Sequence, residues 1–144
     1  MRITEFDLQC EDIMWFGIDS FGNIFECTSA GRGNVPEYVC KSREETDKLL
    51  EFFTETLSKT TTPILLIPEE DNELVDDVKD LSSKGIYCYD LTDYDNDNVY
   101  NCIAKPTVPI NIKDLPSDIQ TILSDHIYSG NIPESASITV EHAY

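Results

Sequence analysis

Basic residues are scarce in this sequence of 144 residues. It contains 10 lysines and arginines against 28 aspartates and glutamates, so its formal net charge is −18. Proteins bind nucleic-acid phosphates and anionic lipids with basic side chains, whose approach releases counterions. The shortage therefore argues against binding to nucleic acid or to a membrane surface. The acidic excess has two interpretations: it keeps the protein soluble, or it steers the protein toward a basic protein partner.

Long hydrophobic runs are missing as well. No stretch approaches the ~18 apolar residues that span a bilayer, and charged residues interrupt the N-terminal segment MRITEFDLQCEDIMWFG, unlike a signal peptide. The cysteines are odd in number and irregularly spaced, which fits neither a secreted disulfide framework nor a paired zinc motif. They are Cys10, Cys27, Cys40, Cys88 and Cys102. We therefore expect a cytoplasmic protein.

Motifs for catalysis, metals and cofactors are also lacking. The only two histidines, His126 and His142, fall in no Ser/His/Asp or Cys/His motif. The stretch DYDNDN, residues 93–98, begins like a calcium loop, but it has no glycine at its sixth position and no acid at its twelfth. We predict no metal site and no cofactor. The sequence favours a non-enzymatic protein, with an enzyme as the alternative.

What is present is the pattern of a single mixed domain over residues 1–144. The β-rich runs Ile13–Ile18 and Ile24–Thr28 flank a Gly/Asn connection, which predicts an N-terminal hairpin. An earlier strand at Ile3–Leu8 is a further candidate. Ser42 and Glu45 have the capping-box spacing, and leucines and phenylalanines then recur at helical intervals, so we predict a helix over 43–58.

The second half of the sequence alternates helices and strands. It predicts a buried strand at Ile64–Ile67, a helix within 71–85 and a strand at Ile86–Leu91, with the two strands parallel and side by side. A further strand before Pro106, a third helix from Pro116 and a final strand near the C-terminus complete the pattern. The fold class is therefore α/β or α+β, with a mixed β-sheet and two or three covering helices.

A glycine-rich loop lies between the hairpin and the helix predicted over 43–58. It contains Ser29, Gly31, Arg32, Gly33 and Asn34. A phosphate-binding loop would place Gly-Lys-Ser directly before the helix, but Cys40 occupies the position of that glycine, and Pro36 removes a backbone donor. We interpret the loop chiefly as a structural corner, in which the glycines supply positive φ angles. A ligand-binding loop and an exposed recognition loop centred on Arg32 are the alternatives.

The segment from Met14 to Phe53, MWFGIDSFGNIFECTSAGRGNVPEYVCKSREETDKLLEFF, resembles small bacterial cytoplasmic proteins, some of which are thought to be immunity proteins. The shared features are an apolar hairpin with a Gly-Asn turn, a Thr-Ser-small-Gly loop, Val-Pro, and Ser-x-Glu-Glu before a helix. Immunity proteins neutralise the toxins of competitors. The resemblance implies a protein that binds a toxin directly, and it assigns a role to no individual residue.

Charge and resemblance together give our first hypothesis, a non-enzymatic acidic domain that binds a basic protein. The partner-binding candidates are Glu69, Glu70, Asp71, Glu73, Asp76, Asp77, Asp90, Asp93, Asp95 and Asp97. They are chosen for local charge density, which steers association. The second hypothesis is a small-ligand or enzymatic domain that uses the Gly31–Gly33 loop. The third is a regulatory or scaffold module that associates with itself.

Overall fold

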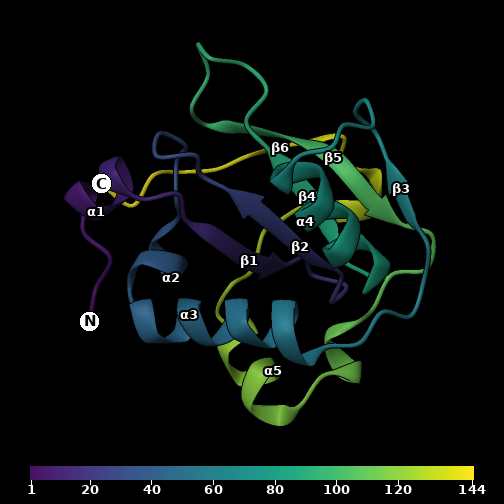
Figure 1. Ribbon diagram of the computed structural model, residues 1–144. Coiled ribbons are helices and arrows are strands. Elements are labelled where there is room, and N and C mark those ends of the chain that lie inside the picture. Colours follow the sequence, from purple (N-terminus) through teal and green to yellow (C-terminus); the bar gives the residue numbers. More distant parts are fainter.

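The computed structural model describes residues 1–144 and shows an α+β fold built around a curled mixed sheet (Figure 1). The α-helices are α1 (Glu5–Cys10), α2 (Glu37–Cys40), α3 (Arg43–Glu51), α4 (Glu73–Ser83) and α5 (Ser117–Leu123). The strands are β1 (Met14–Ile18), β2 (Ile24–Thr28), β3 (Pro63–Leu65), β4 (Tyr87–Asp90), β5 (Val99–Pro106) and β6 (Ser137–Thr139). A π-helical turn, η1 (Phe52–Thr56), extends α3, and two 3₁₀ turns, η2 (Ile112–Asp114) and η3 (Ile132–Glu134), occur later. None of the helices has the combination of length and apolar character that a membrane span requires.

The strands are ordered β1-β2-β4-β5-β3, and β6 pairs with the first half of β5. The β1–β2 hairpin is antiparallel in the register Phe16 opposite Glu26, which confirms the predicted hairpin. Strands β2 and β4 are parallel, and the other neighbours are antiparallel. The carboxyl ends of β2 and β4 therefore lie side by side, at Thr28 and Asp90.

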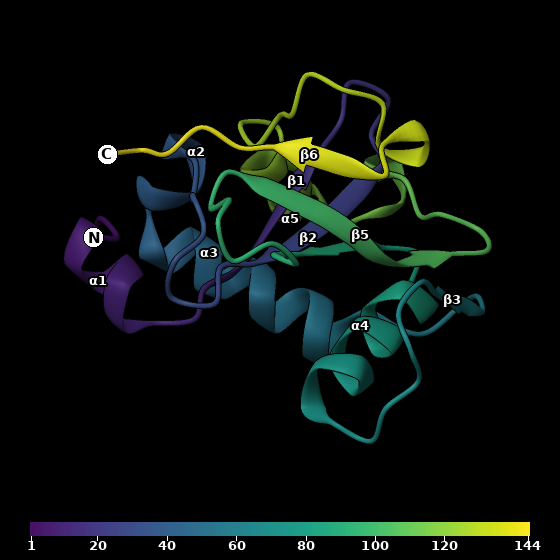
Figure 2. The same ribbon diagram turned by 90° about the horizontal axis from the view of Figure 1, so that it is seen from above.

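Each face of the sheet carries its own hydrophobic core. Helices α3, α4 and α5 pack on one face, where Phe16, Leu49 and Leu81 are buried. The N-terminal segment, α2 and the C-terminal segment cover the other face around Trp15 and Tyr89. Figure 2 shows α3 and α4 on one side of the sheet, with β6 and the C-terminal segment on the other. The prediction of two or three covering helices is thus confirmed.

Two predicted strands differ from the structure. Residues 5–10 form α1 instead of a strand, because Thr4 and Asp7 make a capping box: the Thr4 side chain accepts from the Asp7 N–H, and the Asp7 carboxylate accepts from the Thr4 N–H. The strand predicted as buried at 64–67 is the short edge strand β3, which lies beside β5 and not beside β4. The parallel neighbours are β2 and β4, since β5 takes the place next to β4.

The helix predicted over 43–58 begins as expected and ends differently. The Ser42 side chain accepts from the Glu45 N–H, and the α-helix then widens into η1. At this end the buried Lys84 Nζ donates to the carbonyls of Phe53 and Thr54 at 2.8 and 2.9 Å. It also pairs with Asp80 on α4 at 3.0 Å. Lys84 therefore ties the end of α3–η1 to α4 and fixes the spacing between them.

Candidate functional site

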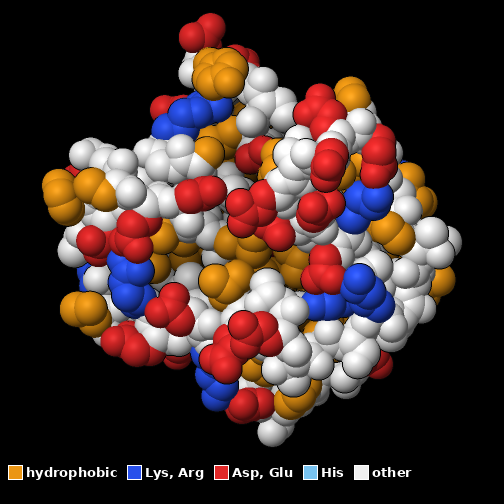
Figure 3. Space-filling view, viewed as in Figure 1, with side chains coloured by type: hydrophobic (Ala, Val, Ile, Leu, Met, Phe, Trp, Pro, Cys, Tyr) orange, Lys and Arg blue, Asp and Glu red, His pale blue; other side chains and the backbone are white.

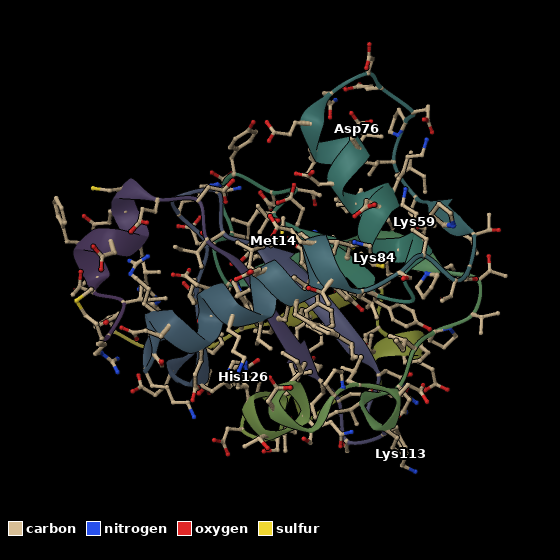
Figure 4. All side chains as sticks on the ribbon, turned by 60° about the horizontal axis from the view of Figure 1, so that its bottom comes forward. Met14, Lys59, Asp76, Lys84, Lys113 and His126 are labelled. Carbon is tan, nitrogen blue, oxygen red and sulfur yellow. The ribbon has the colours of Figure 1, made fainter.

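A groove runs between α3 and α4 over the beginning of β1. It consists of three connected clefts of about 840, 440 and 180 Å³, all of which are lined by Met14 and Leu50. Leu74 and Val78 of α4 complete an apolar floor. Figure 4 shows Met14 beside α3 and Asp76 on α4. We call this feature the acidic groove.

Carboxylates line both banks of the acidic groove. The acids are Asp12 and Asp47 on the side of β1 and α3, and Glu73, Asp76, Asp77 and Asp80 on α4. Asp80 is neutralised by Lys59 and Lys84, but the other five make no ion pair. In Figure 3 acidic side chains stand on both sides of a hydrophobic hollow. The groove therefore combines an apolar floor with uncompensated negative charge.

The electrostatic environment of the groove resists further negative charge. Partial burial, together with the carboxylates of Glu73, Asp80 and Asp76, raises the pKa of Asp77 above its ordinary value. Burial also raises the pKa of Asp90, at the end of β4, with a further contribution from Asp12. A positively charged group entering the groove would relieve this repulsion.

A fully buried carboxyl group, Glu26, lies under the inner end of the groove. It shares one face of β2 with Thr28, which lines the groove, and Thr28 Oγ1 donates to Glu26 Oε1 at 2.6 Å. The second oxygen, Oε2, is buried and has no hydrogen-bond partner. Burial raises the pKa of Glu26 to about 8, so the group is mostly neutral at pH 7.

The structure separates the ten acids predicted to bind a partner. Glu73, Asp76 and Asp77 line the acidic groove. Glu69, Glu70 and Asp71 precede α4 and are exposed, with Glu69 paired to Lys79 at 2.5 Å. The remaining four, Asp90, Asp93, Asp95 and Asp97, lie at the end of β4 and in the β4–β5 loop.

The β4–β5 loop uses part of its charge to hold its own shape. Arg32 pairs with Asp97, donates to the Asp93 carbonyl at 3.2 Å, and lies 5.2 Å from the centre of the Tyr94 ring. Asp93 also accepts from the Asp95 N–H at 2.9 Å. Arg32, which the sequence suggested as an isolated charge on a recognition loop, is thus paired within the fold.

The glycine-rich loop is filled by its neighbours. Ser29 Oγ accepts from the Ile13 N–H at 2.8 Å, and Asn34 Nδ2 donates to the Val140 carbonyl at 2.9 Å. Gly31 has φ +73°, whereas Gly33 allows the Tyr100 side chain to approach the backbone closely. None of the three clefts that form the acidic groove is lined by a residue of this loop. This geometry favours a structural corner over a ligand-binding loop.

The two histidines lie away from the acidic groove. His126 is buried beside Tyr38, and its Nδ1 lies 3.1 Å from the Phe16 carbonyl oxygen. Burial lowers its pKa. His142 stacks edge-on against Tyr144. The chain has no group of three or more His, Cys, Asp or Glu side chains placed to hold a metal ion.

No family model matches this chain, and comparisons with curated proteins and with solved structures found no match. The functional argument therefore depends on the geometry of the site. Sequence reasoning missed Asp12, Asp47 and Glu26. Asp12 and Asp47 are far apart in the sequence, and they lie outside the two acidic segments that were chosen for their local charge density. The sequence does mark Glu26, because it is the single acidic residue in the largely apolar strand segment IFECT.

Proposed function

We propose that the protein is a non-enzymatic binding domain that recognises a basic protein partner through the acidic groove. The observation that carries the proposal is the set of five carboxylates without ion pairs around an apolar floor. Such a surface suits a segment bearing lysine or arginine. The aliphatic part of each side chain can pack on the apolar floor, while its charged end pairs with the carboxylates on either side of the groove.

The proposed interaction divides into two physical contributions. The net charge of −18 attracts a basic partner from a distance, and such steering raises association rates by about 10–10³-fold. The groove supplies the short-range contacts that determine where the partner docks. Met14, Leu50 and Leu74 offer apolar surface, which gives affinity that salt does not screen.

An immunity protein that neutralises a toxin is the biological setting that we propose. Toxins that act on nucleic acids are commonly basic, because they must bind phosphate. An acidic protein that occupies such a surface blocks access of the nucleic acid. Both the charge of this chain and the resemblance of residues 14–53 support this setting.

Catalysis has less support from the site. Glu26 has the most perturbed carboxyl pKa, but it is fully buried and cannot touch a substrate directly. Neither histidine lines the acidic groove. Covalent catalysis requires a nucleophile in hydrogen-bond contact with a base. Thr28 is the hydroxyl of the groove that contacts a carboxyl group, but that group, Glu26, is mostly protonated at pH 7 and is therefore a poor base.

The test is a matched pair of charge-neutralising variants. Asp47→Asn/Asp77→Asn removes one charge from each bank, and Glu134→Gln/Glu141→Gln removes the same total charge from exposed positions outside the groove. Binding of a fluorescent oligo-arginine peptide is measured by anisotropy at physiological salt. We expect the groove variant to bind about tenfold more weakly, which corresponds to about 1.4 kcal/mol, and the control to change less than about twofold. Equal losses of affinity in both variants would show that binding depends on the net charge of the protein and not on the groove.

A further inference from the structure

The inner end of the acidic groove is adjacent to the buried Glu26. The cleft of about 440 Å³ is lined there by Asp12, Asp77 and Thr28. Thr28 is hydrogen-bonded to Glu26, and it stands opposite Met14 in the hairpin register. A single hydroxyl group therefore lies between a carboxyl group without solvent contact and the space where a ligand would enter.

Glu26 is incompletely satisfied in its buried position. Its Oε1 accepts from Thr28, the neighbouring Cys88 thiol is at most a weak donor, and Oε2 has no hydrogen-bond partner, although buried polar atoms are nearly always paired. No cation lies against it to stabilise a negative charge. The titratable groups nearest to it on the same side of the sheet are Cys88 and Asp90 on β4 and Asp12 before β1, while α4 and α3 add Asp77 and Asp47 on the groove side. Cys27 and Tyr100 also interact with its charge, and Cys27 does so from the opposite face of the sheet. The cations that line the clefts, Arg43, Lys59 and Lys79, are each ion-paired with another carboxylate, so a free cation is the missing component.

We propose that the inner end of the acidic groove receives one lysine or arginine side chain of the partner, and that its binding releases a proton from Glu26. This inference rests on the proposed function, because it assumes a basic partner in the groove. The cationic head pairs with Asp12 and Asp77, and one of its N–H groups donates to Thr28 Oγ1. The Thr28 hydroxyl continues to donate to Glu26, which becomes a carboxylate as its proton passes to the solvent.

The size of the coupling follows from Coulomb's law. The calculation assumes a bound unit charge about 6 Å from the carboxyl group, with the Thr28 hydroxyl between them, and an effective dielectric constant of about 20. Such a charge lowers the pKa of Glu26 by about two units. Because the pKa of Glu26 in the free protein is about 8, roughly nine-tenths of the molecules carry this proton at about pH 7. Binding then releases about 0.8 proton per complex, and affinity rises about 25-fold between about pH 6 and pH 8.

The experiment is titration calorimetry of the whole protein with an oligo-arginine peptide at about pH 7. It is repeated in two buffers of different ionisation enthalpy, which gives the number of protons released. We expect about 0.8 proton for the wild-type protein and less than about 0.2 for Glu26→Gln, which keeps the size and the neutral form of the side chain. The carboxyl ¹³C shift of Glu26 in the wild-type protein, followed against pH with and without peptide, gives the same information without a substitution.

The possible outcomes separate this inference from the proposed function. If both proteins bind the peptide in the groove and release equal numbers of protons, the role of Glu26 is wrong and the proposed function stands. If the Glu26 signal titrates at the same pH with and without bound peptide, the inference is likewise overturned. If the peptide binds with no preference for the groove, as judged by the neutralising variants, both proposals fail.

Discussion

Replacing Glu26 by glutamine removes a buried titratable group from the centre of the sheet. Glu26 lies between Phe16 of β1 and Cys88 of β4 and has no solvent exposure. In the unfolded chain its pKa returns to the ordinary value of 4.5, whereas burial in the folded protein raises it to about 8. Between these values the folded state holds a proton that the unfolded state has lost.

The sign of the resulting pH dependence follows from this difference. Because the folded state binds more protons in this window, raising the pH favours unfolding, and stability falls from about pH 4.5 to about pH 8. One pH unit inside the window costs up to about 1.4 kcal/mol. Glu26 alone therefore lowers the free energy of unfolding by about 3.5 kcal/mol between about pH 5 and pH 8. Its contribution becomes constant only about one pH unit above the folded-state pKa, where Glu26 is almost fully ionised in both states.

The assay is urea denaturation of the wild-type protein and of Glu26→Gln at several pH values from about 5 to 9. The difference between the two free energies should grow by about 4 kcal/mol in favour of glutamine over this range of pH. Other groups, such as His126, titrate in both proteins and cancel in this difference. If the two curves stay parallel, Glu26 is not a neutral buried acid, and the coupling proposed for the groove loses its basis.

Three further predictions concern residues that stabilise the fold and its loops. Gly33→Ala should destabilise the fold by about 2 kcal/mol in thermal or urea unfolding, because the new Cβ would meet Tyr100; retention of full stability would contradict the packing described here. Lys84→Met should cost about 2 kcal/mol in the same assay by leaving two carbonyls at the end of the α3–η1 helix unpaired, and a neutral effect would exclude that role. Arg32→Gln should speed amide exchange in the β4–β5 loop and cost at most about 1 kcal/mol, whereas unchanged exchange would show that the pair with Asp97 does not hold the loop.

The local elements with strong sequence signals were predictable. The hairpin has two β-rich runs around a Gly/Asn turn, and α4 has an Asn72 cap followed by apolar residues at helical spacing. The predicted strand at Ile86–Leu91 is confirmed as β4. In each case the pattern is contained within about twenty residues, so no long-range contact decides it.

The order of the strands was not predictable in the same way. Strand, helix and strand in succession suggested that β3 and β4 are neighbours, but β5 pairs with both and separates them. The groove could not be predicted for a related reason. It joins Asp12, Asp47 and Asp77, which are far apart in the chain and approach only when α3 and α4 pack on the same face of the sheet.

The most direct test of the central claim is to map where a basic ligand binds. Backbone amide spectra of ¹⁵N-labelled protein are recorded during titration with oligo-arginine peptide at physiological salt. The account predicts the largest shift changes around Met14, Leu50 and Asp77, with little change on α5 and β6. Changes spread evenly over all acidic surfaces, or centred on the β4–β5 loop, would contradict it.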